Sequence, residues 1–291
     1  MNVAITGASG FIGRNLASRL AIEGHAVRAI STRNRIDPAS LAGCNSIVHL
    51  AGEPVAQRWT AAAKQRIRES RVEGTRRLVD AIAAMAQKPT VLVSASAIGF
   101  YGSRGDAILT EGSPPAPDFL GLLSVAWEAE AAQAESFDVR VVNPRIGVVL
   151  GLGGGALKAM LPAYRLGAGG KIGSGRQWMS WIHVDDLVAL IVFALTDQRL
   201  RGPVNATAPN PVTNADFTRA LARALRRPAI LPVPGFALKL AMGEMSSMLL
   251  GGQRVIPRVA LDAGFKFRYS ELDSALAALF GSHSTSGTPS M

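Results

Sequence analysis

Short apolar runs alternate with longer amphipathic segments along the first half of the chain. The short runs are rich in β-branched residues, which predicts buried strands, at residues 2–6, 26–30, 46–50, 90–94 and 139–143. The longer segments carry apolar residues at helical spacing, at residues 11–22, 60–86 and 123–134. This alternation predicts an α/β fold with a Rossmann-type doubly wound parallel sheet and right-handed crossovers.

The pattern loosens after residue 150. Glycines interrupt residues 151–175, where we expect a mobile loop rather than regular structure. Thr213 and Asp216 have the spacing of a capping box, which predicts that a helix starts there. Helical spacing returns in shorter segments, which predicts a smaller, mostly helical lobe with helices at 182–195, at 217–226 and within 235–280.

Composition limits the class of protein. The chain has 291 residues, of which 48% are hydrophobic, enough for one large domain or two unequal lobes. A single cysteine, Cys44, excludes an internal disulfide framework and a cysteine-rich metal site. No apolar run reaches the roughly 18–20 residues of a membrane helix, and the first strand begins almost at Met1 without a basic leader. We therefore expect a cytoplasmic protein with no membrane partner and no bound metal.

The net charge of +10 raises the question of a nucleic-acid partner. Much of the excess is arginine spread along the predicted helices, and aromatic residues make up only 6% of the chain. Basic and aromatic residues do not interleave, and no nucleic-acid-binding motif is present. We therefore expect no nucleic-acid partner, while a phosphate-rich ligand would itself require local positive charge.

Three glycines follow the first strand directly and open the first helix. The spacing is Gly-x-x-Gly-x-x-Gly, from Gly7 through Gly10 to Gly13, and the residues between include Ser9, Phe11 and Ile12. The first glycine permits a tight turn, the second lets the backbone approach a pyrophosphate, and the third lets helix and strand pack closely. Because the N-terminus of the helix then points free N–H groups at an anion, this strand–turn–helix context predicts a dinucleotide site.

The position of the glycine motif, together with the change of pattern after residue 150, predicts how the chain divides into domains. We expect a dinucleotide-binding domain at residues 1–150, rejoined by about 176–207. A smaller substrate lobe would comprise residues 151–175 and 208–281. The small polar residues at 282–291 predict a disordered tail.

The end of the second strand discriminates between NAD and NADP. NAD-specific sites usually place an acid there to hold the ribose hydroxyls. In this chain Ser31, Thr32 and Arg33 follow the strand, and no acid occurs before Asp37. Hydroxyl groups and an arginine fork suit a 2′-phosphate, so we expect NADP, bound as NADPH. The alternative is that Arg33 is merely an exposed loop charge.

Several longer stretches resemble the extended and atypical short-chain dehydrogenase/reductases. They are Gly7–Gly13, Leu50–Pro54, Ser94–Gly102, Gly147–Gly151, Gly173–Trp178 and Ser180–Asp186. Within that superfamily the chain is similar to the NAD(P)-dependent epimerase subgroup that carries a C-terminal domain of unknown function. The segment from Leu231 to Leu279 resembles that domain, so the resemblance covers nearly the whole chain up to the tail.

The resemblance implies further cofactor contacts beyond the glycine motif. They are Leu50, Ala51, Gly52 and Glu53 after the third strand, Arg71 on the long helix, and Arg145 after the fifth strand. Leu50 and Ala51 could equally be core residues, and Arg71 could be a solvated helix charge. Arg145 follows a buried strand, where a charge needs a partner, which favours a functional role.

The resemblance also implies a catalytic Ser, Tyr and Lys, with the tyrosine and lysine four residues apart on a helix. The lysine charge would lower the tyrosine pKa so that the phenol exchanges protons near neutral pH. No tyrosine of this chain has a lysine four residues on, and the matching helix positions are Leu122 and Ala126. Ser96 and Tyr101 remain as the catalytic candidates. Ser96 could instead cap its own loop, and Tyr101 without a lysine would keep a pKa of roughly 10.

Other polar and aromatic residues fall near the predicted cleft. Glu111 and Asp118 flank a proline-rich turn, and we expect them to close over the cleft. His183 precedes two acids, and its expected role is that of a core or helix-capping histidine. Trp178 and Trp181 could wall a substrate pocket, although packing within the smaller lobe is the stronger expectation.

Two functions stay open. The first is an NADP(H)-binding, epimerase- or oxidoreductase-like protein that acts on an unknown small molecule, with a hydride passing to or from a nicotinamide held over Ser96 and Tyr101. The second is a non-catalytic, NADPH-sensing regulatory protein, which the missing Tyr–Lys pair favours. A homodimer is a further expectation.

Overall fold

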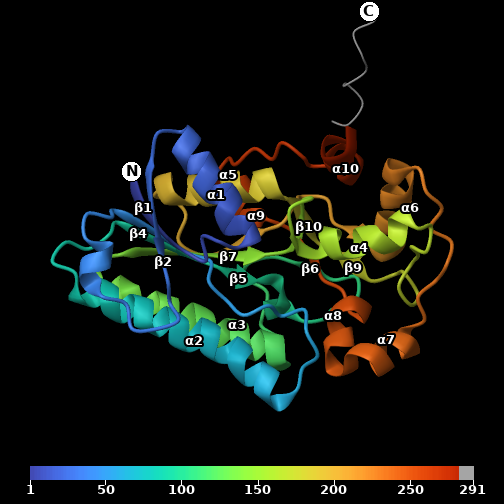
Figure 1. The fold of residues 1–291 in the computed structure, drawn as a ribbon, viewed down its shortest axis with the longest axis horizontal. Coiled ribbons are helices and arrows are strands. Elements are labelled where there is room, and N and C mark those ends of the chain that lie inside the picture. The colour runs from blue at the N-terminus through green and yellow to red at the C-terminus, as the bar shows by residue number, and fades with distance from the viewer. Residues whose placement is uncertain (282–291) are drawn as a thin grey trace, which may run out of the picture.

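A parallel sheet forms the centre of the molecule in the computed structural model, which describes residues 1–281 (Figure 1). Its seven strands are β1 (Asn2–Thr6), β2 (Ala26–Ile30), β3 (Ser46–His49), β4 (Val91–Ser94), β5 (Ser96–Ala97), β7 (Arg140–Ile146) and β11 (Gly202–Ala206). The strand order is β11-β7-β4-β3-β1-β2, with β5 pairing β7. The predicted Rossmann-type parallel sheet is therefore confirmed.

Helices cover both faces of the sheet (Figure 1). The helices α1 (Phe11–Ile22) and α5 (Val184–Thr196) lie on one face, and α2 (Ala61–Ala84) and α3 (Phe119–Ala132) on the other. Successive strand residues point to opposite faces, so Val3 and Ile5 join the core under α1 and α5 while Ala4 joins the core under α2. Both faces are apolar, which is why the strand sequences are continuously hydrophobic.

Strand β7 runs past Pro144, although the predicted strand ends at Asn143. β4 pairs with β7 only as far as Val142, and β5 takes over at Arg145. Pro144 therefore lies at the break between two partners, where a missing N–H removes no ladder hydrogen bond on that side. Strand β11 contains Pro203 and lies at the sheet edge, the position in which a sheet tolerates proline, and the sequence pattern did not predict it.

Two short strand pairs beside the large sheet carry a second apolar core, and we call this part of the molecule the smaller lobe. The strand β8 (Val148–Leu150) pairs with β10 (Trp181–His183), and β9 (Trp178–Met179) pairs with β12 (Val212–Thr213). The helices α4 (Gly155–Arg165) and α6 (Asn214–Leu225) pack beside them. The expectation of an irregular loop throughout residues 151–175 is wrong, because α4 buries Leu157, Leu161 and Tyr164 in the core of this lobe.

The C-terminal region consists of the expected small helices, and part of it returns to the large sheet. Its helices are α7 (Gly235–Met242), α8 (Ser247–Leu250), α9 (Arg258–Asp262) and α10 (Leu272–Phe280). The region also contains the 3₁₀ turn η4 (Gly243–Ser246). Three further 3₁₀ turns lie earlier in the chain, η1 (Pro38–Leu41), η2 (Ile98–Tyr101) and η3 (Gln133–Phe137). The strand β13 (Arg254–Val255) pairs with β6 (Ile108–Leu109), and Ala260 of α9 enters the core beneath α5.

None of the helices among residues 1–281 is both long and apolar enough to cross a membrane. The predicted tail at 282–291 lies outside the described residues.

Candidate cofactor and substrate site

The glycine loop connects β1 to α1 at the C-terminal edge of the sheet. Gly7 has a φ of +72°, and a Cβ there would lie 2.8 Å from the carbonyl oxygen of Leu50. A Cβ on Gly13 would overlap the Gly7 carbonyl oxygen. Only glycine fits these two positions without a shift of backbone, so the loop presses α1 closely against β1 and β3.

No side chain caps the N-terminus of α1. Gly10 is the N-cap residue and supplies no side-chain hydrogen bond, and its N–H donates to the Gly7 carbonyl at 2.9 Å. Ser9 is exposed beside it, and Phe11 and Ile12 are half-buried. This geometry leaves the first N–H groups of the helix available to an anion.

The glycines after residue 150 also relate to this loop. A Cβ on Gly151 or Gly154 would lie 2.6 Å from the Phe11 ring. These glycines therefore let the start of α4 lie against Phe11, next to the predicted pyrophosphate position. This packing accounts for the glycine run, which does not match a phosphate-loop motif.

The end of β2 presents the residues expected to hold a 2′-phosphate. Ser31 and Arg33 are exposed, and the Arg33 N–H donates to the Ser31 hydroxyl at 3.4 Å. Thr32 is buried, and its carbonyl accepts a hydrogen bond of 3.1 Å from Arg77 on α2. Arg33 forms no ion pair among the described residues, so its guanidinium is available to an incoming anion.

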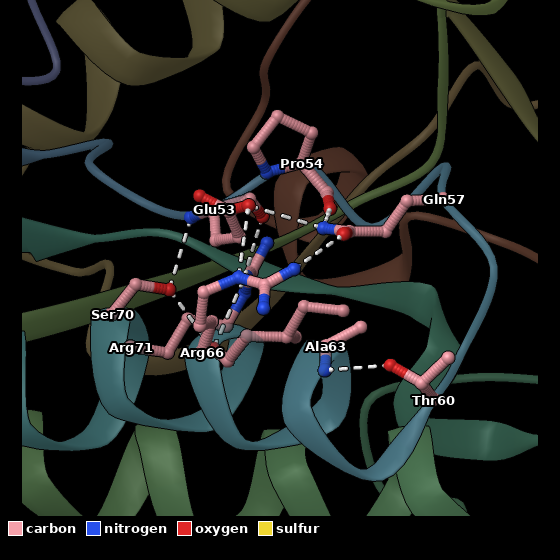
Figure 2. A network of polar contacts seen from close by, with 9 residues as sticks. Glu53, Pro54, Gln57, Thr60, Ala63, Arg66, Ser70 and Arg71 are labelled. Carbon is pink, nitrogen blue, oxygen red and sulfur yellow. Dashed lines mark hydrogen bonds and ion pairs between the residues drawn. The ribbon is translucent and has the colours of Figure 1, made fainter.

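The segment after β3 lies beside the glycine loop and is fixed by hydroxyl groups. The Thr6 hydroxyl accepts from the N–H groups of Leu50 and Ala51 at 3.2 and 3.3 Å. The Glu53 N–H donates to the Ser70 hydroxyl of α2 at 2.9 Å (Figure 2). The predicted cofactor residues that follow β1 and β3 are therefore brought together at one edge of the sheet.

Arg71 lies beneath this segment rather than in solvent. Its Nη1 donates to the Glu53 carbonyl at 3.0 Å, as Figure 2 shows, and its guanidinium lies 5.1 Å from the Trp127 ring centroid. A Cβ on Gly52 would lie 3.2 Å from that guanidinium, so Gly52 permits the approach. Burial lowers the pKa of Arg71 to about 10, with Glu53 acting in the opposite direction. The interpretation of Arg71 as a solvated charge is wrong.

His49 is a buried polar residue of this edge that was not among the predicted site residues. Its two ring nitrogens contact the hydroxyls of Thr6 and Thr75, at 2.5 and 2.9 Å. Burial, together with the nearby Arg71 charge, lowers the pKa of His49 to about 4, so the ring is neutral near pH 7. The signal was available, because a histidine inside an apolar strand requires hydrogen-bond partners.

A cavity of about 280 Å³ adjoins Arg71 on the α3 side of the cofactor edge. Helix α3 faces it with Leu120, Leu123, Ser124 and Trp127. The C-terminal region closes the other side with Glu244, Ser247, Met248 and Gln253. A larger hollow of about 600 Å³ includes Arg140 and Thr90, at the N-terminal ends of β7 and β4. Ligands of open parallel sheets bind at the C-terminal ends of strands, which favours the smaller cavity as the substrate site.

Arg145 holds the catalytic candidates in a buried polar network instead of contacting the cavity. Two hydrogen bonds of 2.8 Å join its guanidinium to Glu128, and a third, of 3.0 Å, reaches the Tyr101 hydroxyl. Tyr101 is fully buried and donates to Asn205 at 2.6 Å, while Ser96 donates to Glu128 at 2.6 Å. Burial raises the pKa of Tyr101, and Arg145 opposes that rise.

This network differs from the arrangement expected for catalysis. Neither Ser96 nor Tyr101 lines the cavity, although Ala97 and Ile98 do. Glu128, which joins Ser96 to Arg145, was not among the predicted residues, since a half-buried helical glutamate gives no distinct sequence signal. The helix positions expected for tyrosine and lysine hold the exposed Leu122 and the half-buried Ala126, so no phenol and no ammonium stands there.

Of the three remaining candidates from the sequence, only Asp118 lies at the cavity. Asp118 lines the cavity and caps α3 by accepting the Gly121 N–H at 2.9 Å. Glu111 instead accepts the N–H groups of Asn205 and Val259, at 2.9 and 3.2 Å, so the expectation that it closes over the cleft is wrong. His183 caps α5 as predicted, accepting the Asp185 N–H at 3.1 Å.

Two of the four tryptophans belong to the smaller lobe. Trp181 is fully buried in its core, whereas Trp178 is half-buried with the Arg254 guanidinium 4.3 Å from its ring centroid. Neither lines the 280 Å³ cavity, and the expectation of packing is confirmed for Trp181. Across residues 1–281, His, Cys, Asp and Glu side chains form no group suited to a metal ion.

Comparison with known proteins identifies the family. The model of the NAD dependent epimerase/dehydratase family matches residues 3–206, and a domain of unknown function, DUF1731, matches residues 233–279. The chain therefore belongs to the NAD-dependent epimerase/dehydratase family of short-chain dehydrogenase/reductases. Its match to the second model places it with the members that carry this C-terminal domain, so the resemblance read from the sequence is confirmed.

Individual relatives match over almost their full lengths. The chain is 43% identical to an Arabidopsis thaliana chloroplastic homolog of epimerase family protein SDR39U1, over 96% of this chain and 86% of that protein. It is 39% identical to epimerase family protein YfhF of Bacillus subtilis, over 98% and 100% of the two chains.

Two solved structures of similar sequence also match nearly all of this chain. The crystal structure of human epimerase family protein SDR39U1 with NADPH matches with a TM-score of 0.89 and 36% identity, covering 97% of this chain and 99% of that one. A Corynebacterium glutamicum nucleoside-diphosphate sugar epimerase matches with a TM-score of 0.80 and 36% identity, covering 97% of this chain and 58% of that one.

Proposed function

We propose that this chain binds NADPH along the C-terminal edge of its sheet and transfers a hydride to or from a small molecule held in the 280 Å³ cavity. The arrangement that carries the proposal is the proximity of the glycine loop, the Leu50–Glu53 segment and this cavity at one edge. The human relative crystallised with NADPH supports the choice of cofactor.

Each part of the cofactor has a candidate partner in this chain. The N-terminus of α1, at Gly10 and Gly13, suits the pyrophosphate, and the exposed Ser31 and Arg33 suit the 2′-phosphate. When bound, NADPH would supply the hydride. Arg71 would contact the cofactor from beneath the Leu50–Glu53 segment.

The catalytic assignment changes in the light of the buried network. Ser96 and Tyr101 are engaged by Glu128, Arg145 and Asn205, so we propose that they position β5 and the turn after it rather than exchange protons with a substrate. Arg145 is then a structural partner of Glu128 rather than a cofactor contact. A polar side chain of the cavity itself, such as Ser124 or Asp118, is better placed to meet a substrate oxygen.

Parallel titrations with NADPH and NADH test the cofactor proposal. We expect NADPH to bind more tightly, and Arg33→Gln to weaken NADPH binding by about tenfold while leaving NADH binding unchanged, since the 2′-phosphate loses one charged partner. Arg35→Gln is the matched control, because Arg35 is an exposed arginine two residues further on. Equal or tighter binding of NADH by the unaltered chain would refute the preference.

A non-catalytic NADPH-sensing role is the second candidate. The observation that favours it is the absence of a phenol and an ammonium at Leu122 and Ala126. A turnover assay over carbonyl compounds and sugar nucleotides separates the two functions. Tight NADPH binding without oxidation of NADPH across that panel would favour the sensor.

Location and assembly complete the proposal. We propose a reducing compartment such as the cytoplasm, because the single cysteine, Cys44, is buried and unpaired. The homodimer expected from the sequence stays a prediction, and so does the division of the chain into a dinucleotide-binding domain and a substrate lobe.

A further inference from the structure

Two long stretches that build much of the smaller lobe contain no acidic residue. Residues 139–184 carry neither Asp nor Glu, and the same holds for residues 217–243. These stretches include all of α4 and α7 and most of α6, which Figure 1 shows gathered at the end of the molecule away from the N-terminus. A large part of the +10 net charge is therefore concentrated at this end, in addition to the arginines of the long helices.

Five exposed cations at this end have no carboxylate partner among the described residues. They are Arg165, Lys171, Arg226, Arg227 and Lys239. The nearest acids along the chain pair with other residues. Asp216 pairs with Arg219, and Glu244 pairs with Lys64 at 2.6 Å.

Large apolar side chains are exposed between these cations. Leu166 is 84% exposed and Ile230 is 79% exposed. On α7, Phe236 and Leu240 are 76% and 81% exposed, stand four residues apart on one face of the helix, and flank Lys239. Helix α7 has no buried residue, and although Met242 packs against the cluster around Trp59, packing within the chain does not account for Phe236 and Leu240.

The backbone brings these residues together. The segment 228–233 runs beside residues 167–173, with hydrogen bonds of 2.9 Å from the Val233 N–H to the Lys171 carbonyl and from the Gly173 N–H to the Val233 carbonyl. Helix α7 begins two residues after Val233. We call the five cations together with Leu166, Ile230, Leu231, Phe236 and Leu240 the basic apolar end.

We propose that the basic apolar end docks on the surface of an anionic lipid membrane. Exposed apolar side chains beside positive charges fit a membrane interface, where the apolar groups enter the headgroup boundary and the cations meet lipid phosphates. The five cations have no carboxylate partner among the described residues, so their charges are available to anionic headgroups. This contact is peripheral and needs no spanning helix, and it departs from the sequence-based expectation of no membrane partner.

Vesicle sedimentation tests the proposal on the full chain. One set of vesicles contains phosphatidylcholine with phosphatidylglycerol, and the other contains phosphatidylcholine alone. We expect binding to the first set only, and weakening at raised salt because the charges are exposed. Phe236→Ser with Leu240→Ser should reduce binding by about tenfold through loss of apolar insertion. Arg226→Gln with Arg227→Gln should reduce it by about tenfold through loss of two charges.

Matched controls and a folding readout keep the result decisive. Ile22→Ser removes an equally exposed apolar side chain, 80% exposed, from α1, outside the basic apolar end, and Arg68→Gln with Arg258→Gln removes two exposed charges elsewhere. Both controls should bind vesicles like the unaltered chain, and every variant should bind NADPH with unchanged affinity. Absence of binding to anionic vesicles at low salt would overturn the proposal. So would undiminished binding by the α7 variant, or a concentration-dependent dimer that the same α7 substitutions abolish.

Discussion

At the scale of single residues, the Arg145 guanidinium is held on several sides. Its side chain is only 4% exposed, and it is held by Glu128, by the Tyr101 hydroxyl and by the Phe100 ring, whose centroid lies 3.4 Å away. The sequence correctly indicated that a charge after a buried strand has a partner. It could not identify Glu128, because the partner comes from a helix 17 residues earlier and is chosen by packing.

Removing the Glu128 charge tests this network. We expect Glu128→Gln to lower the free energy of unfolding by about 3 kcal/mol, since it leaves a buried cation without its counter-ion. Denaturant unfolding measures the change. Glu130→Gln is the control on the same helix, because Glu130 pairs with the exposed Arg76 and exposed pairs contribute little. A loss for Glu128→Gln no larger than for the control would contradict the structural role.

His49 gives a prediction about pH. Its folded-state pKa is lowered to about 4 from the ordinary value of 6.5, so the unfolded chain binds more protons between these pH values. Stability from the neutral ring is therefore complete above pH 6.5 and is lost as the pH falls towards 4. We expect a loss of about 2 kcal/mol between pH 7 and pH 5, at 1.36 kcal/mol per pH unit below 6.5.

The His49→Gln variant isolates this effect. Glutamine does not titrate, so the difference in the free energy of unfolding between pH 7 and pH 5 should shrink by that amount even though the variant is less stable at both values. Denaturant titrations at the two pH values supply the measurement. An unchanged pH difference in the variant would assign the titration to another group.

At the scale of elements, prediction succeeded where one local signal dominated. The bounds of β1, α1 and β2 agree with the predicted ranges, because β1 and α1 end at glycine turns and β2 ends where polar residues begin. Helix α3 begins four residues before its predicted start, since the Asp118 cap was not recognised. Helix α4 was missed because its flanking glycines outweighed the spacing of Leu157, Leu161 and Tyr164, which was visible in the sequence.

The start of α3 supplies a prediction for an element. We expect Asp118→Ala to lower the free energy of unfolding by about 1 kcal/mol, because the Gly121 N–H loses its acceptor. Asp118→Asn keeps a capping oxygen and should cost a fraction of that. Denaturant unfolding of the two variants gives the comparison. Equal losses would show that the carboxylate charge, rather than the cap, stabilises this end of the helix.

At the scale of the whole molecule, the cofactor side of the site could be predicted and the substrate side could not. The glycine loop and the end of β2 are short local motifs, and consecutive residues of the sequence supply all of their cofactor-binding groups. The cavity is lined by segments from Val55 to Gln253, and no local pattern brings those segments together. The basic apolar end could not be predicted for the same reason, because its parts lie on either side of residues 174–225 in the sequence.

The two lobes share strands, and this predicts how the chain unfolds. Val149 enters the core of the large sheet while the next residue, Leu150, enters the core of the smaller lobe, and Ile182 and Trp181 are divided in the same way. Strands β8 and β10 therefore cannot unfold in one lobe without exposing apolar surface in the other. We expect one cooperative transition, although chains of this length often unfold in parts.

Single-tryptophan variants can test this expectation, since Trp59 reports on the large domain and Trp181 on the smaller lobe. With the other three tryptophans replaced by phenylalanine, both reporters should give the same urea midpoint. NADPH at 100 times its Kd should stabilise both by about 2.7 kcal/mol, because a ligand that binds only the folded state stabilises every part that unfolds with its site. Separate midpoints, or a shift confined to Trp59, would mean that the lobes unfold independently and that the shared strands do not couple them.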